Sequence, residues 1–273
     1  MIVNNPRKIA KNALIQSLGD SQWNENCILS DRLKKKLSEH PINQHPMIPL
    51  LSDGAYDKEK LFYIHMEYRK SIVQVFTDAL IMLQYKARDL ESTFYPGIKA
   101  IPRFLLTLNT LDEFGFRPGF DSQQYYQGNP NLAHYPLYEN VLSSFNVDKS
   151  KDYKTSESAN KLEKFMEDSF NEYILIAGLL AVAEQIVCLF SPPLKANTEA
   201  IGLETKNGYY FFHGTSEDKE IEANDDDHED DLWALITHSV DEDNFDRLSK
   251  TCLDYCDLWV EFWDQQMNSL KLS

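Results

Sequence analysis

The sequence is poor in positive charge and has no phosphate-binding motif. Its 27 lysines and arginines stand against 43 aspartates and glutamates, which gives a formal charge of −16. Binding to a nucleic-acid backbone requires a concentrated positive surface, so this charge argues against nucleic acid as a partner. No glycine-rich phosphate loop, dinucleotide fingerprint or serine nucleophile elbow occurs, and nucleotide-dependent enzymes and serine hydrolases are therefore not indicated.

Cysteine is also scarce, with four residues in the chain and no Cys-x-x-Cys pair. A disulfide framework is not indicated, and the N-terminal segment lacks the apolar core of a secretory signal, so we expect a cytoplasmic location. Cys252 and Cys256 are four residues apart, a spacing that could serve a metal. Their apolar neighbours favour two packed free thiols instead.

One apolar run, from Tyr173 to Phe190, is about long enough to cross a membrane. It contains Glu184 and Gln185, and acidic residues rather than basic anchors precede it. These features favour the buried core helix of a soluble domain, and we expect no membrane association.

Helical periodicity dominates the rest of the chain and strand signals are weak. The pattern predicts an all-α domain of about seven to nine helices, spanning residues 1–273 without a linker. Gly115 is a good helix C-cap, Ser30 a good N-cap, and the prolines at 192 and 193 should stop a helix. Helices are predicted near residues 5–18, 30–40, 57–91, 96–114, 135–146 and 157–190, with two or three more in 205–270.

Glu184 is the most informative single residue. On a helix, the positions one and two turns away from it are all apolar, among them Ala177, Leu180 and Val187. A carboxylate on such a stripe costs several kcal/mol unless a cation, hydrogen bonds or a metal compensates it. The sequence leaves two interpretations open: a metal ligand, or a buried ion pair with a residue such as Arg103.

Glu113 presents a similar problem at the end of a predicted helix. An acid at a helix C-terminus opposes the helix dipole at a cost of about 0.3–1 kcal/mol, so a compensating cation is expected. Asp112 beside it is interpreted as exposed or as a helper residue. Three histidines follow at His134, His213 and His228. Carboxylates and imidazoles without a thiolate suit iron or manganese better than structural zinc.

The order of these residues resembles that of the heme-oxygenase-like diiron oxidases and oxygenases. The resemblance covers about residues 60–270 and leaves residues 1–56 as an N-terminal helical extension. The motifs that carry it are Asn109…Glu113-Phe-Gly, His134-x-x-Leu137, Ala183-Glu184, an aromatic-led His213 and Asp225-x-x-His228.

The resemblance implies a heme-oxygenase-like helical bundle with two Fe(II) ions per chain, iron being favoured over manganese. It also implies dioxygen and a small amine, amino acid or fatty-acid-like molecule as substrates, with N-oxygenation or oxidative C–C cleavage as the reaction. A homodimer is the default expectation for oligomeric state. The implied metal ligands are Glu113, His134, Glu184, His213, either Glu217 or Asp225, and His228.

The chain departs from the family pattern in its last two histidines. His213 and His228 are fifteen residues apart, where the family has about seven, and fifteen helical residues rise about 22 Å. Both can bind one centre only if the helix is interrupted between them. The run Asn224-Asp-Asp-Asp offers N-cap residues for such an interruption.

Two other functions remain open. One is a cofactorless oxidase or hydrolase on the same fold, like the pyrroloquinoline-quinone synthase and thiaminase II relatives, for which Cys188 is a conceivable nucleophile. The other is a non-enzymatic interaction protein that uses the acidic run from Glu217 to Asp231, which holds ten carboxylates and one lysine.

Overall fold

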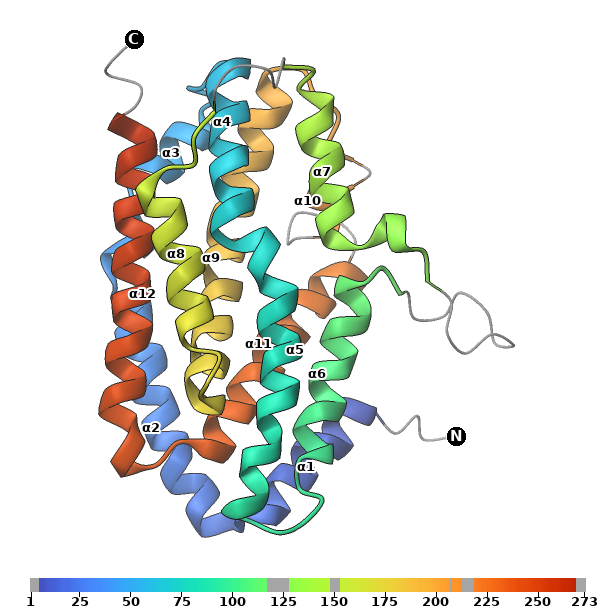
Figure 1. Cartoon of the computed structure of the whole chain (residues 1–273), viewed down its shortest axis with the longest axis vertical. Coiled ribbons are helices and arrows are strands. Elements are labelled where there is room, and N and C mark those ends of the chain that lie inside the picture. The colour runs from blue at the N-terminus through green and yellow to red at the C-terminus, as the bar shows by residue number, and fades with distance from the viewer. Residues whose placement is uncertain (1–4, 117–127, 148–152, 207, 213–218, 269–273) are drawn as a thin grey trace.

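Helix α9 (Tyr173–Ala200) forms the centre of the fold, and most other helices pack around it (Figure 1). The structure is a computed structural model that describes residues 5–116, 128–147, 153–206, 208–212 and 219–268, with the side chains of 212–227 outside the description. In these residues the all-α prediction is confirmed, and the one β-contact is an isolated bridge between Phe116 and Gly128.

Helices from both ends of the chain are interleaved in the bundle, since the last two helices both pack against the second. The bounds are α1 (Pro6–Leu18), α2 (Asp20–Ser38), α3 (Met47–Ser52), α4 (Lys58–Tyr68), α5 (Gln74–Lys86), α6 (Ala100–Glu113), α7 (His134–Ser144), α8 (Glu157–Asp168), α10 (Tyr209–Phe212), α11 (Lys219–Ser239) and α12 (Glu242–Asn268). Short 3-10 turns cover Pro41–Gln44, Ala87–Ser92 and Pro130–Leu132, and a π-helical turn covers Arg69–Val73.

The chain is divided into more helices than expected because two predicted long helices are interrupted. The segment 57–91 contains the π-helical turn Arg69–Val73 between α4 and α5. The segment 157–190 is broken between α8 and α9, where backbone turns at Ser169 and Glu172 replace the helical pattern. Apolar periodicity continues across both interruptions, which is why the sequence did not reveal them.

Two predicted helix boundaries are wrong. Ser30 lies inside α2 instead of capping it, and its hydroxyl bonds to that of Thr237 at 2.8 Å. Helix α9 continues through Pro192 and Pro193 to Ala200. A proline inside a helix costs about 3 kcal/mol. Burial of the last turns offsets this cost, and the side chain of Asn197 exchanges two hydrogen bonds with the backbone of Tyr56.

The apolar interior is continuous from the first helix to the last. Leu14 of α1 and Leu33 of α2 belong to the same hydrophobic cluster as the core of α9 and as Trp259 and Trp263 of α12. The N-terminal extension therefore shares the bundle core. Cys252 and Cys256 are buried free thiols in that core, as predicted.

Helix α9 is the one described helix that is long and apolar enough to cross a membrane. In its most apolar window, 78% of the residues are buried inside the protein. Its hydrophobicity is therefore explained by its place at the centre of the bundle, as the sequence predicted.

His65 of α4 is fully buried and its hydrogen bonds define a neutral ring. The carbonyl of Leu61 can only accept, so Nδ1 donates to it at 2.7 Å and Nε2 is left to accept from the hydroxyl of Tyr210. Burial lowers the pKa of His65 from its ordinary 6.5 to about 4. The unfolded chain therefore takes up this proton at a higher pH than the folded protein does.

We expect His65 to make the fold acid-sensitive. Its contribution to stability is complete above pH 6.5 and is lost as the pH falls toward 4. Urea unfolding at pH 7 and pH 4.5 should show that His65→Gln reduces the stability difference between the two pH values by about 2 kcal/mol. An unchanged difference in the variant would contradict the neutral buried ring.

Candidate metal centre

Helix α6 ends on a tight turn that delivers two acidic side chains into the bundle. Glu113 is its last residue, and the turn passes through Gly115, whose φ is +80°. A Cβ on Gly115 would lie 2.5 Å from the carbonyl oxygen of Asn129 and 2.6 Å from the nitrogen of Ala133. Glycine is therefore required here for both conformation and space. The close approach places the start of α7 directly against the end of α6.

His134 is the first residue of α7 and bonds to Glu113 across this turn. Its Nδ1 lies 2.9 Å from Glu113 Oε1, and both side chains are buried. An ionised carboxylate only accepts hydrogen bonds, so the imidazole donates from Nδ1 and carries its lone pair on Nε2. Carboxylates orient metal-binding histidines in the same way, through the ring nitrogen that does not face the metal.

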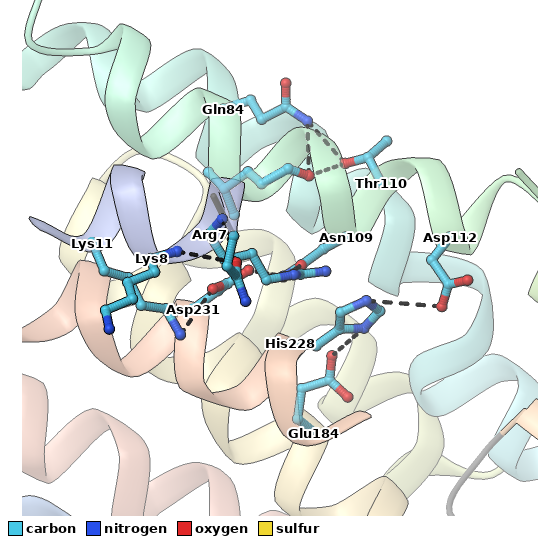
Figure 2. A network of polar contacts seen from close by, with 12 residues as sticks. Arg7, Lys8, Lys11, Gln84, Asn109, Thr110, Asp112, Glu184, His228 and Asp231 are labelled. Carbon is cyan, nitrogen blue, oxygen red and sulfur yellow. Dashed lines mark hydrogen bonds and ion pairs between the residues drawn. The ribbon is translucent and has the colours of Figure 1, made fainter. Parts of the chain in front are cut away.

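Glu184 and His228 come from the two helices opposite. Glu184 lies in the middle of α9, and the Nδ1 of His228 on α11 is 3.9 Å from its Oε1 (Figure 2). On the other side of the ring, Nε2 is 3.8 Å from Asp112 Oδ2. Both separations exceed hydrogen-bond length, and among the described residues Nε2 has no hydrogen-bond partner.

Asp112 faces the two imidazoles, a position that the sequence alone did not indicate. Its side chain is 14% exposed, and Oδ2 faces both imidazoles, 3.9 Å from His134 Nε2 and 3.8 Å from His228 Nε2. The interpretation of Asp112 as an exposed residue is wrong. Five side chains from four helices thus converge, and we call them the acid–imidazole cluster: Asp112, Glu113, His134, Glu184 and His228.

A small apolar cavity adjoins the cluster. Its volume is about 30 Å³, which suits one water molecule or a diatomic gas. Glu113, His134 and Glu184 contribute the polar part of its wall. The remaining wall comes from α5, the π-helical turn, α7, α9 and α10, through Ile72, Val73, Phe76, Thr77, Tyr135, Val187 and Tyr209.

Burial sets the protonation states around this cavity. Burial, followed by the positive charge of Arg7, lowers the pKa of His228 to about 3, so its ring is neutral at neutral pH. Burial is also the main reason that the pKa of Tyr209 is raised well above 10, and the charges of Glu113 and Glu184 add to the shift. Tyr209 therefore lines the cavity as a neutral phenol, and the adjoining cluster contains the neutral imidazole of His228.

The structure does not place every predicted ligand. His213 and Glu217 lie outside the described residues, and the side chain of Asp225 is likewise outside them. The helix boundary predicted at Asn224 is wrong, because α11 begins at Lys219 and runs through that position. An N-cap residue type was not sufficient to start a helix at Asn224.

Three other interpretations can be compared with the described residues. Arg103 donates to the backbone carbonyls of Gln84 and Tyr85, so the proposed ion pair with Glu184 is not observed. Cys188, the conceivable nucleophile, is exposed. The acidic run, considered as an interaction surface, is not exposed throughout, because its last residue, Asp231, is fully buried on α11.

The chemistry of the cluster fits a metal ion that prefers oxygen and imidazole ligands. Two ligands that are each about 2.1 Å from one ion can be no more than about 4.2 Å apart. The separations between Asp112 Oδ2 and the two Nε2 atoms, 3.9 Å to His134 and 3.8 Å to His228, lie within that limit. As they stand, however, the described residues contain no group of three or more acids, histidines or cysteines arranged to hold a metal.

Comparison with known proteins supports the fold. No protein-family model matches the chain, and no curated protein matches it. Among solved structures it is similar to a CADD-like protein of unknown function from Nostoc punctiforme, with a TM-score of 0.59 and 15% identity. The similarity covers 90% of this chain and 95% of that chain. It bears out the predicted all-α bundle of the heme-oxygenase-like kind.

Gly115→Ala should displace the start of α7 from the end of α6. The added Cβ meets backbone atoms, which cannot rotate away, and the positive φ adds strain. We expect a loss of about 2–4 kcal/mol in unfolding free energy, measured by urea denaturation. Gly97→Ala is the matched control, because Gly97 has φ +95° but open space at its Cβ position. Equal losses in the two variants would contradict the close approach.

Proposed function

We propose that the protein is a non-heme diiron enzyme that uses dioxygen to oxidise a small organic substrate. The supporting observation is the acid–imidazole cluster, which gathers three carboxylates and two imidazoles from α6, α7, α9 and α11 in an apolar interior. Ligands of this kind, projecting inward from several helices of one bundle, are typical of dinuclear carboxylate sites. Iron bound there supplies the one-electron chemistry that dioxygen requires.

Each residue of the cluster has a distinct task in this proposal. Asp112, Glu184 and the Nε2 atoms of the two histidines would hold the metal. Glu113 orients His134 through the 2.9 Å hydrogen bond and offers its second oxygen as a ligand. His213 and either Glu217 or Asp225 remain predicted ligands that would complete the coordination.

The size of the cavity suits dioxygen but not the organic substrate. At about 30 Å³ it is large enough for a diatomic molecule, and its wall is mostly aliphatic and aromatic. We infer that dioxygen occupies it and that the organic substrate, an amine, amino acid or fatty-acid-like molecule, approaches along the cavity wall formed by Tyr135 and Tyr209.

Iron reconstitution tests the function directly. After anaerobic incubation with Fe(II) and desalting, elemental analysis should find about two iron ions per chain. Admission of dioxygen should then give a transient visible absorption, followed by stopped-flow spectrophotometry. Parallel incubations with Mn(II) and Zn(II) establish whether the response belongs to iron. Absence of retained iron under these conditions would overturn the proposal.

Glu184→Gln tests the site assignment. The substitution preserves shape and removes the ligand charge, so the variant should retain less than about half of the wild-type iron while its helix content by circular dichroism is unchanged. Glu67→Gln is the matched control. Glu67 is equally buried but accepts its hydrogen bonds from Tyr153 and Ser156, away from the cluster. Full iron in Glu184→Gln, or equal loss in both variants, would show that the site is elsewhere.

A cofactorless oxidase on the same fold is the second candidate. Among the described residues, no three acids, histidines or cysteines are arranged to hold a metal, which favours this candidate. The positive charge of Arg7 near His228 favours it as well. Turnover that survives exhaustive chelation would support this candidate. The hydrolase alternative loses its nucleophile, because Cys188 is exposed and does not line the cavity.

A further inference from the structure

Arg7, in the N-terminal extension, reaches into the bundle between two of the helices that carry the acid–imidazole cluster (Figure 2). Its Nη1 donates to Asn109 Oδ1 on α6 at 3.1 Å and also to Asp231 Oδ2 on α11. The Arg7 side chain is 15% exposed, and that of Asp231 is 0% exposed. One guanidinium thus joins three helices in a largely dry environment.

The two partners of Arg7 are adjacent to the cluster along their own helices. Asn109 is four residues before Glu113 on α6, and Asp231 is three residues after His228 on α11. Residues three or four apart share a helix face, so a contact at Asn109 or Asp231 sets the rotation of the turn that carries the cluster residue. Arg7 therefore contacts both helices that carry the Asp112–His228 pair, one turn away from the pair on each.

The position of Arg7 in its own helix shows that this contact is specific. Asn5 caps α1, accepting from the backbone nitrogens of Arg7 and Lys8, and Arg7 is the second helical residue. A cation in the first turn is disfavoured by the helix dipole, which favours an acid there. Asp231 supplies that negative charge from another helix, and Lys11, one turn further along α1, lies 3.1 Å from its other oxygen.

We propose that Arg7 is a positioning residue of the candidate metal centre: it ties the last turn of α6 to α11 and so keeps the α6 carboxylates opposite His228. The N-terminal helix is then a component of the site and not an accessory extension. A planar guanidinium suits this role because it offers several donors in a fixed geometry, which a lysine ammonium does not. The metal-binding part of this inference rests on the proposed function.

The experiment compares Arg7→Ala and Arg7→Lys with Lys8→Ala, an exposed neighbour on the same helix. Hydrogen–deuterium exchange of the metal-free proteins comes first. Arg7→Ala should raise exchange at the end of α6 (residues 109–116) and around His228 on α11, as well as in α1. Lys8→Ala should leave these segments unchanged. A rise confined to α1 would overturn the positioning role, because Arg7 would then only hold its own helix in place.

Metal titration is the second measurement. Co(II), followed by its visible absorption, should bind about tenfold or more weakly to Arg7→Ala, the loss typical for residues that orient ligands, and Arg7→Lys should recover only part of it. Asp231→Asn should weaken binding similarly, and the double variant should be no worse than either single one. Leu14→Ala controls for general destabilisation, because it removes a buried α1 side chain outside these contacts and should preserve the affinity.

The two measurements separate the possible failures. If wild-type protein binds no metal but Arg7→Ala still loosens both α6 and α11, the proposed function fails and the positioning role is supported. If wild-type protein binds metal and Arg7→Ala binds it with equal affinity and an identical Co(II) spectrum, the positioning role is overturned and the proposed function stands.

Discussion

The structure depends on the compensation of charge where four helices meet in an apolar interior. Three carboxylates and two imidazoles lie there, and desolvation makes each ionised group expensive unless it has a partner. The partners come from helices that are distant in the sequence. Helix α7 provides an imidazole to the end of α6, and α11 provides another beside α9. Helix α1 provides a guanidinium that contacts both α6 and α11. A simpler bundle could omit all of these groups and be more stable. These groups are what make this region a candidate site.

The sequence indicated those residues of the candidate site whose charge is unfavourable in their local surroundings. Glu184 was recognisable because its helical neighbours are apolar, and Glu113 because an acid at a helix end opposes the dipole. Asp112 lies in the same last turn and opposes the dipole as well, but its place in the cluster depends on the opposing position of α11, which the sequence does not give. The same reasoning explains the errors in the fold. Ser30 and Asn224 have the residue types of helix caps, but tertiary packing carries the helices past them.

Arg7 lay beyond local sequence reasoning for a clear physical reason. Its partners Asn109 and Asp231 are 102 and 224 residues away, so no periodicity or spacing connects them. Residues 1–56 are separated from the core only by the family resemblance, which begins at about residue 60. In the fold, Leu14 and Leu33 enter the common interior, and Arg7 enters the polar region beside the cluster. The distinction between core and extension is therefore one of sequence pattern and not of packing.

The π-helical turn at Arg69–Val73 has a consequence for the shape of the cavity. Hydrogen bonding from i to i+5 accommodates one more residue than an α-helical turn, and each α-helical residue corresponds to about 100° of rotation. Ile72 and Val73 in this turn and Phe76 and Thr77 after it all face the cavity. Deletion of a single residue here would rotate α5 about its axis by roughly a quarter of a turn. The set of side chains that lines the cavity therefore depends on the π-helical turn.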